Sequence, residues 1–351
     1  MSPLLPIRCL PLAEWPAADR EAWNEAVRSA DLLDTSRLLA HMPKDKQRDL
    51  RTAYGRWLGF LGDALHAHTG LSGLDLVTED TLLAFIKVLK ASLAPHSVAA
   101  YITYLERAAR AMPTDRDLTF LSYAATNLRR VARPAKDKRQ RLKPTQELYE
   151  LGIALMEAAE ERPNPIKAAA MFRDGIMIAL LAARPVRLSN LASIDINRHL
   201  ERHGEDYWLV FPSEEVKNRR HLEFPLPRNL TESMETYLSR YRPPLMARTG
   251  PGNHGPHDGL WVSASGSKLS SHQIYNRICD RTRERFGHSI NPHLFRDAAA
   301  TSVAIEDPVH VGIVAAILGH STFRTAEQYY NQATSLEAAR KYQATVRAYR
   351  A

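Results

Sequence analysis

Residues 293–330 of this chain read HLFRDAAATSVAIEDPVHVGIVAAILGHSTFRTAEQYY. His293 and Arg296 lie three residues apart, His320 follows a glycine, and Tyr329 comes nine residues after His320. Arginine and histidine side chains bind phosphate oxygens, and a tyrosine hydroxyl is a nucleophile. This stretch therefore indicates metal-free attack on a phosphodiester, if the rest of the chain supplies the remaining groups.

The composition is that of an ordinary globular protein. Of 351 residues, 44% are apolar and 25% are charged, and the length suits two domains. The longest nearly apolar run, residues 175–186, is too short to span a bilayer. The N-terminus does not have the pattern of a signal peptide. Cys9 and Cys279 are far apart, which favours reduced thiols over a disulfide or a zinc site. We therefore expect a cytoplasmic protein with no membrane partner.

The positive charge is concentrated in one segment. The net charge is +8, and residues 34–143 hold 19 Lys and Arg against 11 Asp and Glu. This excess indicates a polyanionic partner. A solvated basic face without a partner is the alternative that charge alone leaves open.

The first part of the chain is predicted to be helical. Residues 1–33 are read as a short lead-in that contains one helix, over residues 17–30. Residues 34–132 are expected to form a helical bundle, since their apolar residues recur at helical spacing. The expected helices of this bundle cover residues 46–66, 78–89, 96–112 and 118–131.

A basic connector is predicted next. Residues 129–143 contain eight Lys or Arg residues out of fifteen and are interrupted by Pro134. Such a run repels itself and is expected to be extended, as a strap along a nucleic-acid backbone. The predicted DNA contacts are Arg129, Arg130, Arg133, Lys136, Lys138, Arg139, Arg141 and Lys143.

Residues 144–351 are expected to form a second, mixed domain. A helix start is expected at Pro144, and residues 168–183 are apolar enough for a buried helix. Residues 206–212 and 221–227 have the composition of a β-hairpin. Helices are expected from about Thr231 and Ser271, and residues 337–349 predict a last amphipathic helix. The fold class is thus mainly α with a small antiparallel β-sheet.

Sequence motifs for other kinds of chemistry are missing. The sequence has no glycine-rich phosphate loop, no HExxH, no CxxC and no carboxylate cluster suited to Mg²⁺. Metal-dependent nucleases and ATP-driven enzymes are therefore disfavoured, and no cofactor or metal is expected.

Taken together, the motifs resemble those of the tyrosine recombinases, the phage integrase family. Residues 184–191 read RPVRLSNL, similar to the family pattern T-G-L-R-hydrophobic-S-E-L, which places Arg187 at the position of the first catalytic arginine. Lys217 stands nine residues before Leu226 of an F-P-L sequence, like the family's hairpin lysine. The H-x-x-R, L-G-H-S and tyrosine motifs fall on His293, Arg296, His320 and Tyr329.

The resemblance implies a role for each of these residues. Arg187 and Arg296 would clamp the scissile phosphate, and His320 would donate to a non-bridging oxygen. His293 would act as base or acid near the tyrosine. Lys217 would protonate the leaving 5′ oxygen, and Tyr329 would form a 3′-phosphotyrosine that a second DNA strand resolves.

Several positions depart from the family pattern or compete for a role. Asn190 stands where glutamate is usual, Pro185 where glycine is, and Asp297 where a histidine often follows. Tyr330 is a rival to Tyr329, but the nine-residue spacing favours Tyr329. Arg219 and Arg220 are rivals to Lys217, but arginine is a poor acid.

The resemblance also implies the architecture, a two-domain Xer-like or Cre-like layout. Residues 34–132 would be the helical core-binding domain, residues 133–143 the linker and residues 144–351 the mixed α+β catalytic domain. Residues 96–112 and 271–285 are the expected base-reading helices. The tail helix would dock on a neighbouring protomer or pack on its own domain.

The expected partner is double-stranded DNA in the nucleoid. The expected assembly is a tetramer on two DNA sites, with a monomer as the free state. A type IB topoisomerase-like relaxing enzyme and a catalytically inactive DNA-binding protein are the alternatives to a site-specific recombinase.

Overall fold

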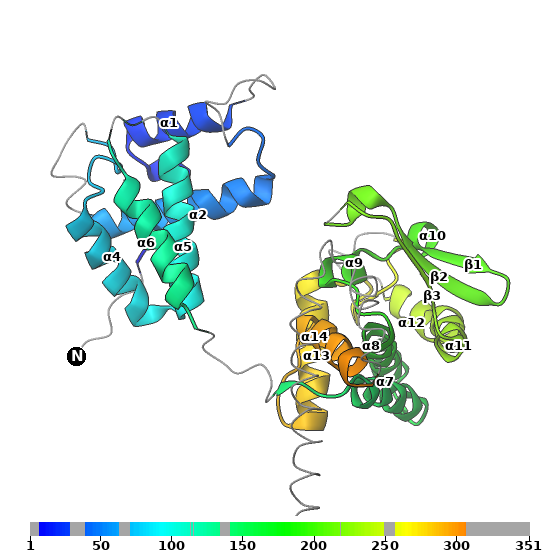
Figure 1. Ribbon diagram of the computed structural model, residues 1–351. Helices are drawn as coiled ribbons and strands as arrows, with labels where there is room; N and C mark the ends of the chain where they lie inside the picture. Colours follow the sequence, from blue (N-terminus) through cyan, green and yellow to red (C-terminus); the bar gives the residue numbers. More distant parts are fainter. Residues whose placement is uncertain are drawn as a thin grey trace, which may run out of the picture. The chain divides into compact units, whose positions relative to one another are not determined.

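The chain divides into two compact units. The computed structural model describes residues 7–28, 39–62, 71–112, 114, 116–133, 141–217, 219–248 and 257–306. One unit spans residues 1–137 and the other residues 138–351 (Figure 1). The described part is mainly helical with one three-stranded antiparallel sheet, which confirms the predicted fold class. Within it, no helix is long and apolar enough to cross a membrane.

The first unit is helical, as predicted. Its elements are η1 (Leu12–Glu14), α1 (Ala17–Val27), α2 (Lys44–Leu61), α4 (Glu79–Ser92), α5 (Pro95–Ala111) and α6 (Thr119–Val131). Thr78 begins α4 through a capping box with Thr81, and Pro95 occupies the first turn of α5, where its missing N–H is not needed. Gly62 ends α2 with a positive φ of 44°.

The predicted lead-in contributes to the core of this unit. Trp15 and Trp23 are 3% exposed and pack edge to face, and Trp15 also contacts Tyr54 of α2. Asp19 of α1 is buried and accepts hydrogen bonds from the Tyr54 hydroxyl and from the Gly73 N–H. Burial raises the pKa of Asp19 despite these two donors. The segment around α1 is therefore part of the helical unit and does not merely precede it.

The basic run of residues 129–143 begins inside helix α6. Residues 129–131 form the last turn of α6, and Ala132 is buried. The helix predicted over residues 118–131 is therefore present as α6, and it continues into the start of the basic run because Leu121 and Ala125 bury one of its faces.

The second unit combines a helical layer with the small sheet. Its helices are α7 (Thr145–Glu160), α8 (Pro165–Ala183), α9 (Leu188–Ser193), α10 (Ile196–His199), α11 (Arg228–Thr236), the π-helix η4 (Tyr237–Tyr241), α12 (Arg242–Met246), α13 (Ser271–Phe286) and α14 (Pro292–Glu306). Its strands are β1 (Leu200–His203), β2 (Asp206–Phe211) and β3 (Leu222–Pro225), with the 3₁₀ turn η3 (Ser213–Glu215) after β2.

The predicted hairpin is confirmed as β2 and β3. Trp208 pairs with Pro225 and Phe211 with Leu222. The sheet also contains β1, which was not predicted, because three of its four residues are exposed and its sequence, LERH, does not alternate. Strand β1 pairs with β2 on the edge opposite to β3.

Two glycines allow α7 and α8 to pack with their backbones in close contact (Figure 1). A Cβ on Gly152 would lie 2.6 Å from the Ala179 backbone N and 2.7 Å from the Gly175 carbonyl oxygen. The start of α7 is also tied to α14, since the Thr145 N–H donates to the Ser302 hydroxyl at 3.2 Å. This bond holds the second half of helix α14 on α7.

Gly152→Ala is expected to destabilise the second unit by about 1–3 kcal/mol, because overpacking displaces backbone atoms. Urea denaturation followed by circular dichroism measures the change. Ala154→Gly, on the exposed side of α7, is the control, with a helix-propensity cost of about 1 kcal/mol. A gain in stability for Gly152→Ala would contradict the close packing.

Candidate active site

The structure brings the two predicted phosphate-binding arginine segments together. Arg296 lies on α14, is 6% exposed, and its Nη1 donates to the carbonyl oxygen of Pro185. Pro185 is two residues before Arg187, which is half-buried and forms the N-cap of α9. Two segments more than one hundred residues apart therefore meet at this hydrogen bond.

The first turn of α14 presents His293 to solvent. The Asn291 side chain accepts hydrogen bonds from the His293 N–H at 3.0 Å and the Leu294 N–H at 3.2 Å, which starts the helix. Leu294 and Phe295 are buried, whereas His293 is exposed. Because residues three apart share a helix face, His293 and Arg296 project from neighbouring positions on α14.

Arg184 joins the same segment to the sheet. It ends α8, and its Nε donates to the Pro225 carbonyl of β3 at 3.2 Å. Its guanidinium lies 6.0 Å from the centre of the Phe224 ring. Burial lowers the pKa of Arg184. The residues before Arg187 thus contact both α14 and the hairpin that carries Lys217.

Lys217 lies in the turn after η3 and is exposed. Val216, directly before it, is buried. The Arg219 N–H donates to the Val216 carbonyl at 2.7 Å, and Arg219 has a positive φ of 51°. Arg219 and Arg220 are exposed too. The geometry keeps Lys217 at the surface of the turn.

The three departures from the family pattern lie within or beside this site. Pro185 supplies the carbonyl that Arg296 contacts, a group that glycine would also provide. Asn190 is 2% exposed, and its Nδ2 has no hydrogen-bond partner among the described residues. Asp297 is half-buried, next to Arg296 on α14.

The remaining predicted groups lie outside the described residues. These are His320, Tyr329, the rival Tyr330 and the tail helix of residues 337–349. Of the six predicted catalytic residues, Arg187, Lys217, His293 and Arg296 are therefore among the described residues.

Sequence reasoning missed a buried charge cluster that fixes α13. Asp174 of α8 is 1% exposed and accepts from Arg173 at 2.7 Å, from Arg277 at 2.8 Å and from Arg281 at 3.0 Å. Burial by itself raises the pKa of Asp174, but the three guanidinium groups outweigh burial and lower it. The Arg-Asp pair inside the apolar run of residues 168–183 was the available signal, because buried charges need partners.

The predicted linker contacts fall into three groups. Arg129, Arg130 and Arg133 are exposed at the end of the first unit. Lys136, Lys138 and Arg139 lie outside the described residues. The last two predicted contacts lie on the second unit.

The two contacts on the second unit are Arg141 and Lys143. Arg141 donates to the Ser289 carbonyl. Lys143 pairs with Glu147 at 3.4 Å and lies 5.2 Å from the centre of the Phe286 ring. Their charges are therefore partly engaged within the protein.

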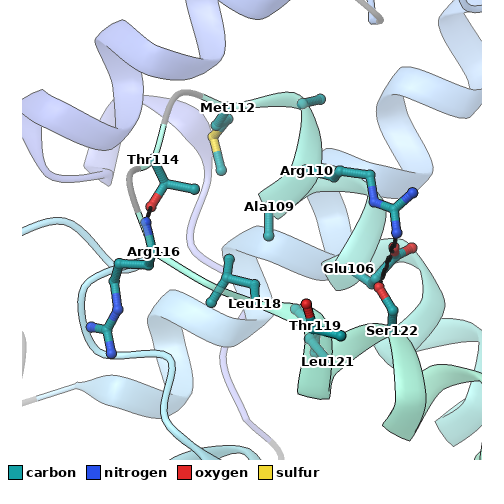
Figure 2. Close-up of a pocket in the computed structure, with 11 residues that line it drawn as sticks. Glu106, Ala109, Arg110, Met112, Thr114, Arg116, Leu118, Thr119, Leu121 and Ser122 are labelled. Carbon is teal, nitrogen blue, oxygen red and sulfur yellow. Dashed lines mark hydrogen bonds and ion pairs between the residues drawn. The ribbon is translucent and has the colours of Figure 1, made fainter.

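The first unit contains a pocket that is separate from these residues. It has a volume of about 600 Å³ and lies at the turn between α5 and α6. Figure 2 shows Glu106, Arg110 and Ser122 joined by hydrogen bonds and an ion pair on one side, and Met112 and Leu118 toward the other side. None of the predicted catalytic residues lines it, so it is not the candidate active site.

The sequence matches a known family. Residues 153–336 match the model of the phage integrase family, and this range covers more than half of the chain. The protein thus belongs to the phage integrase family, the tyrosine recombinases.

Two curated relatives share this part of the chain. Both are named tyrosine recombinase XerC, one from Bifidobacterium longum subsp. infantis and one from Bifidobacterium longum strain DJO10A. Each is 26% identical over 179 residues, which cover 49% of this chain and 46% of the relative. The chain therefore spans about half the length of the curated relatives it matches.

Solved structures of XerH site-specific recombinase share the fold. The post-cleavage complex with a palindromic difH substrate has a TM-score of 0.57 at 14% identity, over 95% of this chain and 98% of that chain. The pre-cleavage complex with difH has a TM-score of 0.55 at 14% identity, over 84% of this chain and 78% of that one. At this identity the similarity shows the fold alone.

Asp174→Asn is expected to destabilise the second unit by about 3–5 kcal/mol at pH 7, because it leaves Arg173 buried without its carboxylate partner. The folded-state pKa of Asp174 is lowered, so its contribution is present above the unfolded pKa of about 4 and is lost as the pH falls through the folded pKa. Urea denaturation at several pH values measures this.

The difference in the free energy of unfolding between the wild type and Asp174→Asn should become smaller once the pH falls below about 4. Asp280→Asn is the matched control, since Asp280 pairs with Arg283 on the exposed face of α13, and it is expected to change stability by less than about 1 kcal/mol. Equal effects of the two substitutions would contradict the role of the buried cluster.

Proposed function

We propose that the protein is a site-specific DNA recombinase that cuts and rejoins duplex DNA through a 3′-phosphotyrosine intermediate. The observation that carries the proposal is the contact between the buried Arg296 guanidinium and the Pro185 carbonyl, two residues from Arg187. Paired guanidinium groups suit the non-bridging oxygens of a phosphate. Membership of the phage integrase family and the relatives named as tyrosine recombinases support the same chemistry.

In the proposed cleavage step, the Tyr329 hydroxyl oxygen attacks the scissile phosphorus and passes its proton to His293. A bond forms between phosphorus and the tyrosine oxygen while the bond from phosphorus to the 5′ oxygen breaks. Lys217 donates a proton from Nζ to the leaving 5′ oxygen. General acid and base groups of this kind each contribute about 10²–10⁴-fold.

The phosphorane that forms during attack carries additional negative charge. Arg187 and Arg296 stabilise it through their fixed N–H donors, and His320 donates to a further non-bridging oxygen. Fixed donors are effective because they need no reorganisation as the charge develops. Such a set of groups suffices without a metal ion.

Rejoining is the reverse reaction with a different strand. A 5′ hydroxyl attacks the phosphotyrosine and gives its proton to Lys217, while the bond from phosphorus to the tyrosine oxygen breaks and His293 returns a proton to Tyr329. The phosphotyrosine bond conserves the energy of the broken phosphodiester, so the cycle needs no ATP. Exchange between two sites by this route serves integration, excision or resolution, depending on the arrangement of the sites.

The proposed partner is duplex DNA, bound by a tetramer on two sites. Helix α13 is suited to reading bases, because its buried side is fixed by Asp174 while His272, Gln273 and Asn276 are exposed. The exposed arginines at the end of α6 are proposed to contact phosphates.

The first test is the formation of a covalent adduct. The protein is incubated without divalent metal with sheared, nicked genomic DNA of its source, and adducts that survive denaturation are captured and sequenced. We expect the wild-type protein to form adducts at one DNA sequence. The yield of adducts should fall more than about 10³-fold for Tyr329→Phe, since the nucleophile is removed.

Tyr330→Phe is the matched control and is expected to retain the adduct. Adducts that persist in Tyr329→Phe would refute the nucleophile assignment. Adducts at random positions, with relaxation of any supercoiled plasmid, would support a topoisomerase. DNA binding without any adduct would support an inactive DNA-binding protein.

A further inference from the structure

We propose that His199 and Glu215 are positioning residues that hold Lys217 for protonation of the leaving 5′ oxygen. This inference rests on the proposed function and adds to it a partly buried polar contact outside the six proposed catalytic residues. His199 is the last residue of α10, and Glu215 is the last residue of η3, two residues before Lys217.

The contact joins α10 to the turn that leads to Lys217. Nε2 of His199 lies 2.7 Å from Oε2 of Glu215. Arg198 forms an ion pair with the other carboxylate oxygen, Oε1. Both oxygens of Glu215 are therefore engaged by neighbouring residues of α10, and the end of η3 is held from one side.

The hydrogen bonds determine which nitrogen of His199 carries the proton. Nδ1 accepts from the Asp195 N–H at 2.9 Å, so this nitrogen is unprotonated. Nε2 therefore carries the proton, and this N–H donates a hydrogen bond to the Glu215 carboxylate. The ring is 3% exposed and stacks on Phe211 of β2, with 5.2 Å between centroids and 28° between planes. The hydrogen bonds at both ring nitrogens and the stacking contact on one face therefore hold the imidazole ring in a single orientation.

The turn is thereby fixed up to the residue before Lys217. Glu215 is held by His199, and Val216 is 2% exposed. Lys217 is the first exposed residue after this buried anchor. A lysine on a free loop samples many positions, whereas fixing its backbone reduces the entropy lost when Nζ reaches the 5′ oxygen.

Comparison with other pairs on the same sheet shows that this pair is unusual. His203 and Glu201 on β1 lie 3.0 Å apart, and His221 and Glu223 lie 3.2 Å apart, but all four side chains are about half exposed. In the His199–Glu215 pair the side chains are only 3% and 22% exposed. Partial burial of a carboxylate costs desolvation free energy, and apolar residues would stabilise the fold at least as well. Placement of the turn accounts for such a pair directly before Lys217.

The test compares two leaving groups in single-turnover cleavage. The substrates are nicked duplexes that carry the site recovered by adduct sequencing, one with the natural 5′ oxygen and one with sulfur in its place at the scissile bond. A thiolate leaves without a proton because a thiol is far more acidic than an alcohol. A defect in proton donation therefore affects only the oxygen substrate.

Glu215→Ala is expected to slow cleavage of the oxygen substrate by roughly 10–100-fold, in line with other losses of supporting hydrogen bonds. It should cleave the sulfur substrate within about twofold of the wild-type rate and bind DNA with unchanged affinity, because only proton donation is impaired. Glu215→Gln, which keeps an acceptor for His199, should restore part of the rate. Glu201→Ala on β1 is the matched control and should behave as the wild type.

The outcomes separate this inference from the proposed function. If neither substrate is cleaved by the wild type, the proposed function is wrong and the inference with it. If Lys217→Ala is rescued by sulfur but Glu215→Ala and Glu215→Gln cleave the oxygen substrate normally, only the positioning role is wrong. An equal fall in the cleavage rate of both substrates in Glu215→Ala or Glu215→Gln also refutes the positioning role, since such a fall would reflect a structural defect.

Discussion

The buried carboxylate of Asp174 is the charge on which the second unit depends. It lies on a helix whose neighbouring side chains are nearly all apolar, and it is compensated by one arginine of its own helix and two of α13. Because an uncompensated charge in such a place is costly, the packing of α13 on α8 is set by charge as well as by shape. Helix α8 then ends in the segment that leads to Arg187, so its placement also decides where the site begins.

The proposed catalytic residues of the described part come from segments that are far apart in the sequence, and directed polar contacts hold these segments. Arg296 meets the Pro185 carbonyl, Arg184 meets the Pro225 carbonyl, and His199 meets Glu215. Hydrogen bonds constrain direction more strongly than apolar packing does. Short elements such as α9 and η3, which have little core of their own, are positioned in this way.

The sequence predicted the helices and hairpin well, since their spacing and caps are local. Thr78, Pro95 and Pro144 mark helix starts where the structure has them. The positions of Arg187, His293 and Arg296 came from family motifs. The contact of Arg296 with Pro185 did not, because periodicity contains no information on contacts across one hundred residues. The role of α1 in the core and the His199 contact were missed for the same reason.

Strand β1 shows a different limit of predicting structure from the sequence. Its exposed residues have no alternation, and it is a strand only because β2 offers a partner. Tertiary pairing of this kind overrides local propensity.

Helix α14 is secured at two points along its length. Arg296 is fixed to the Pro185 carbonyl, and Ser302, six residues later, accepts from the Thr145 N–H. One contact leaves a helix free to slide or turn, whereas two contacts on different turns define both its axial position and its rotation. A slip by one residue translates a helix by about 1.5 Å, and displacements of about 1 Å cost catalysts roughly 10²-fold. The helix that presents His293 and Arg296 thus has its register set by the amino end of α7, a part of the unit that does no chemistry.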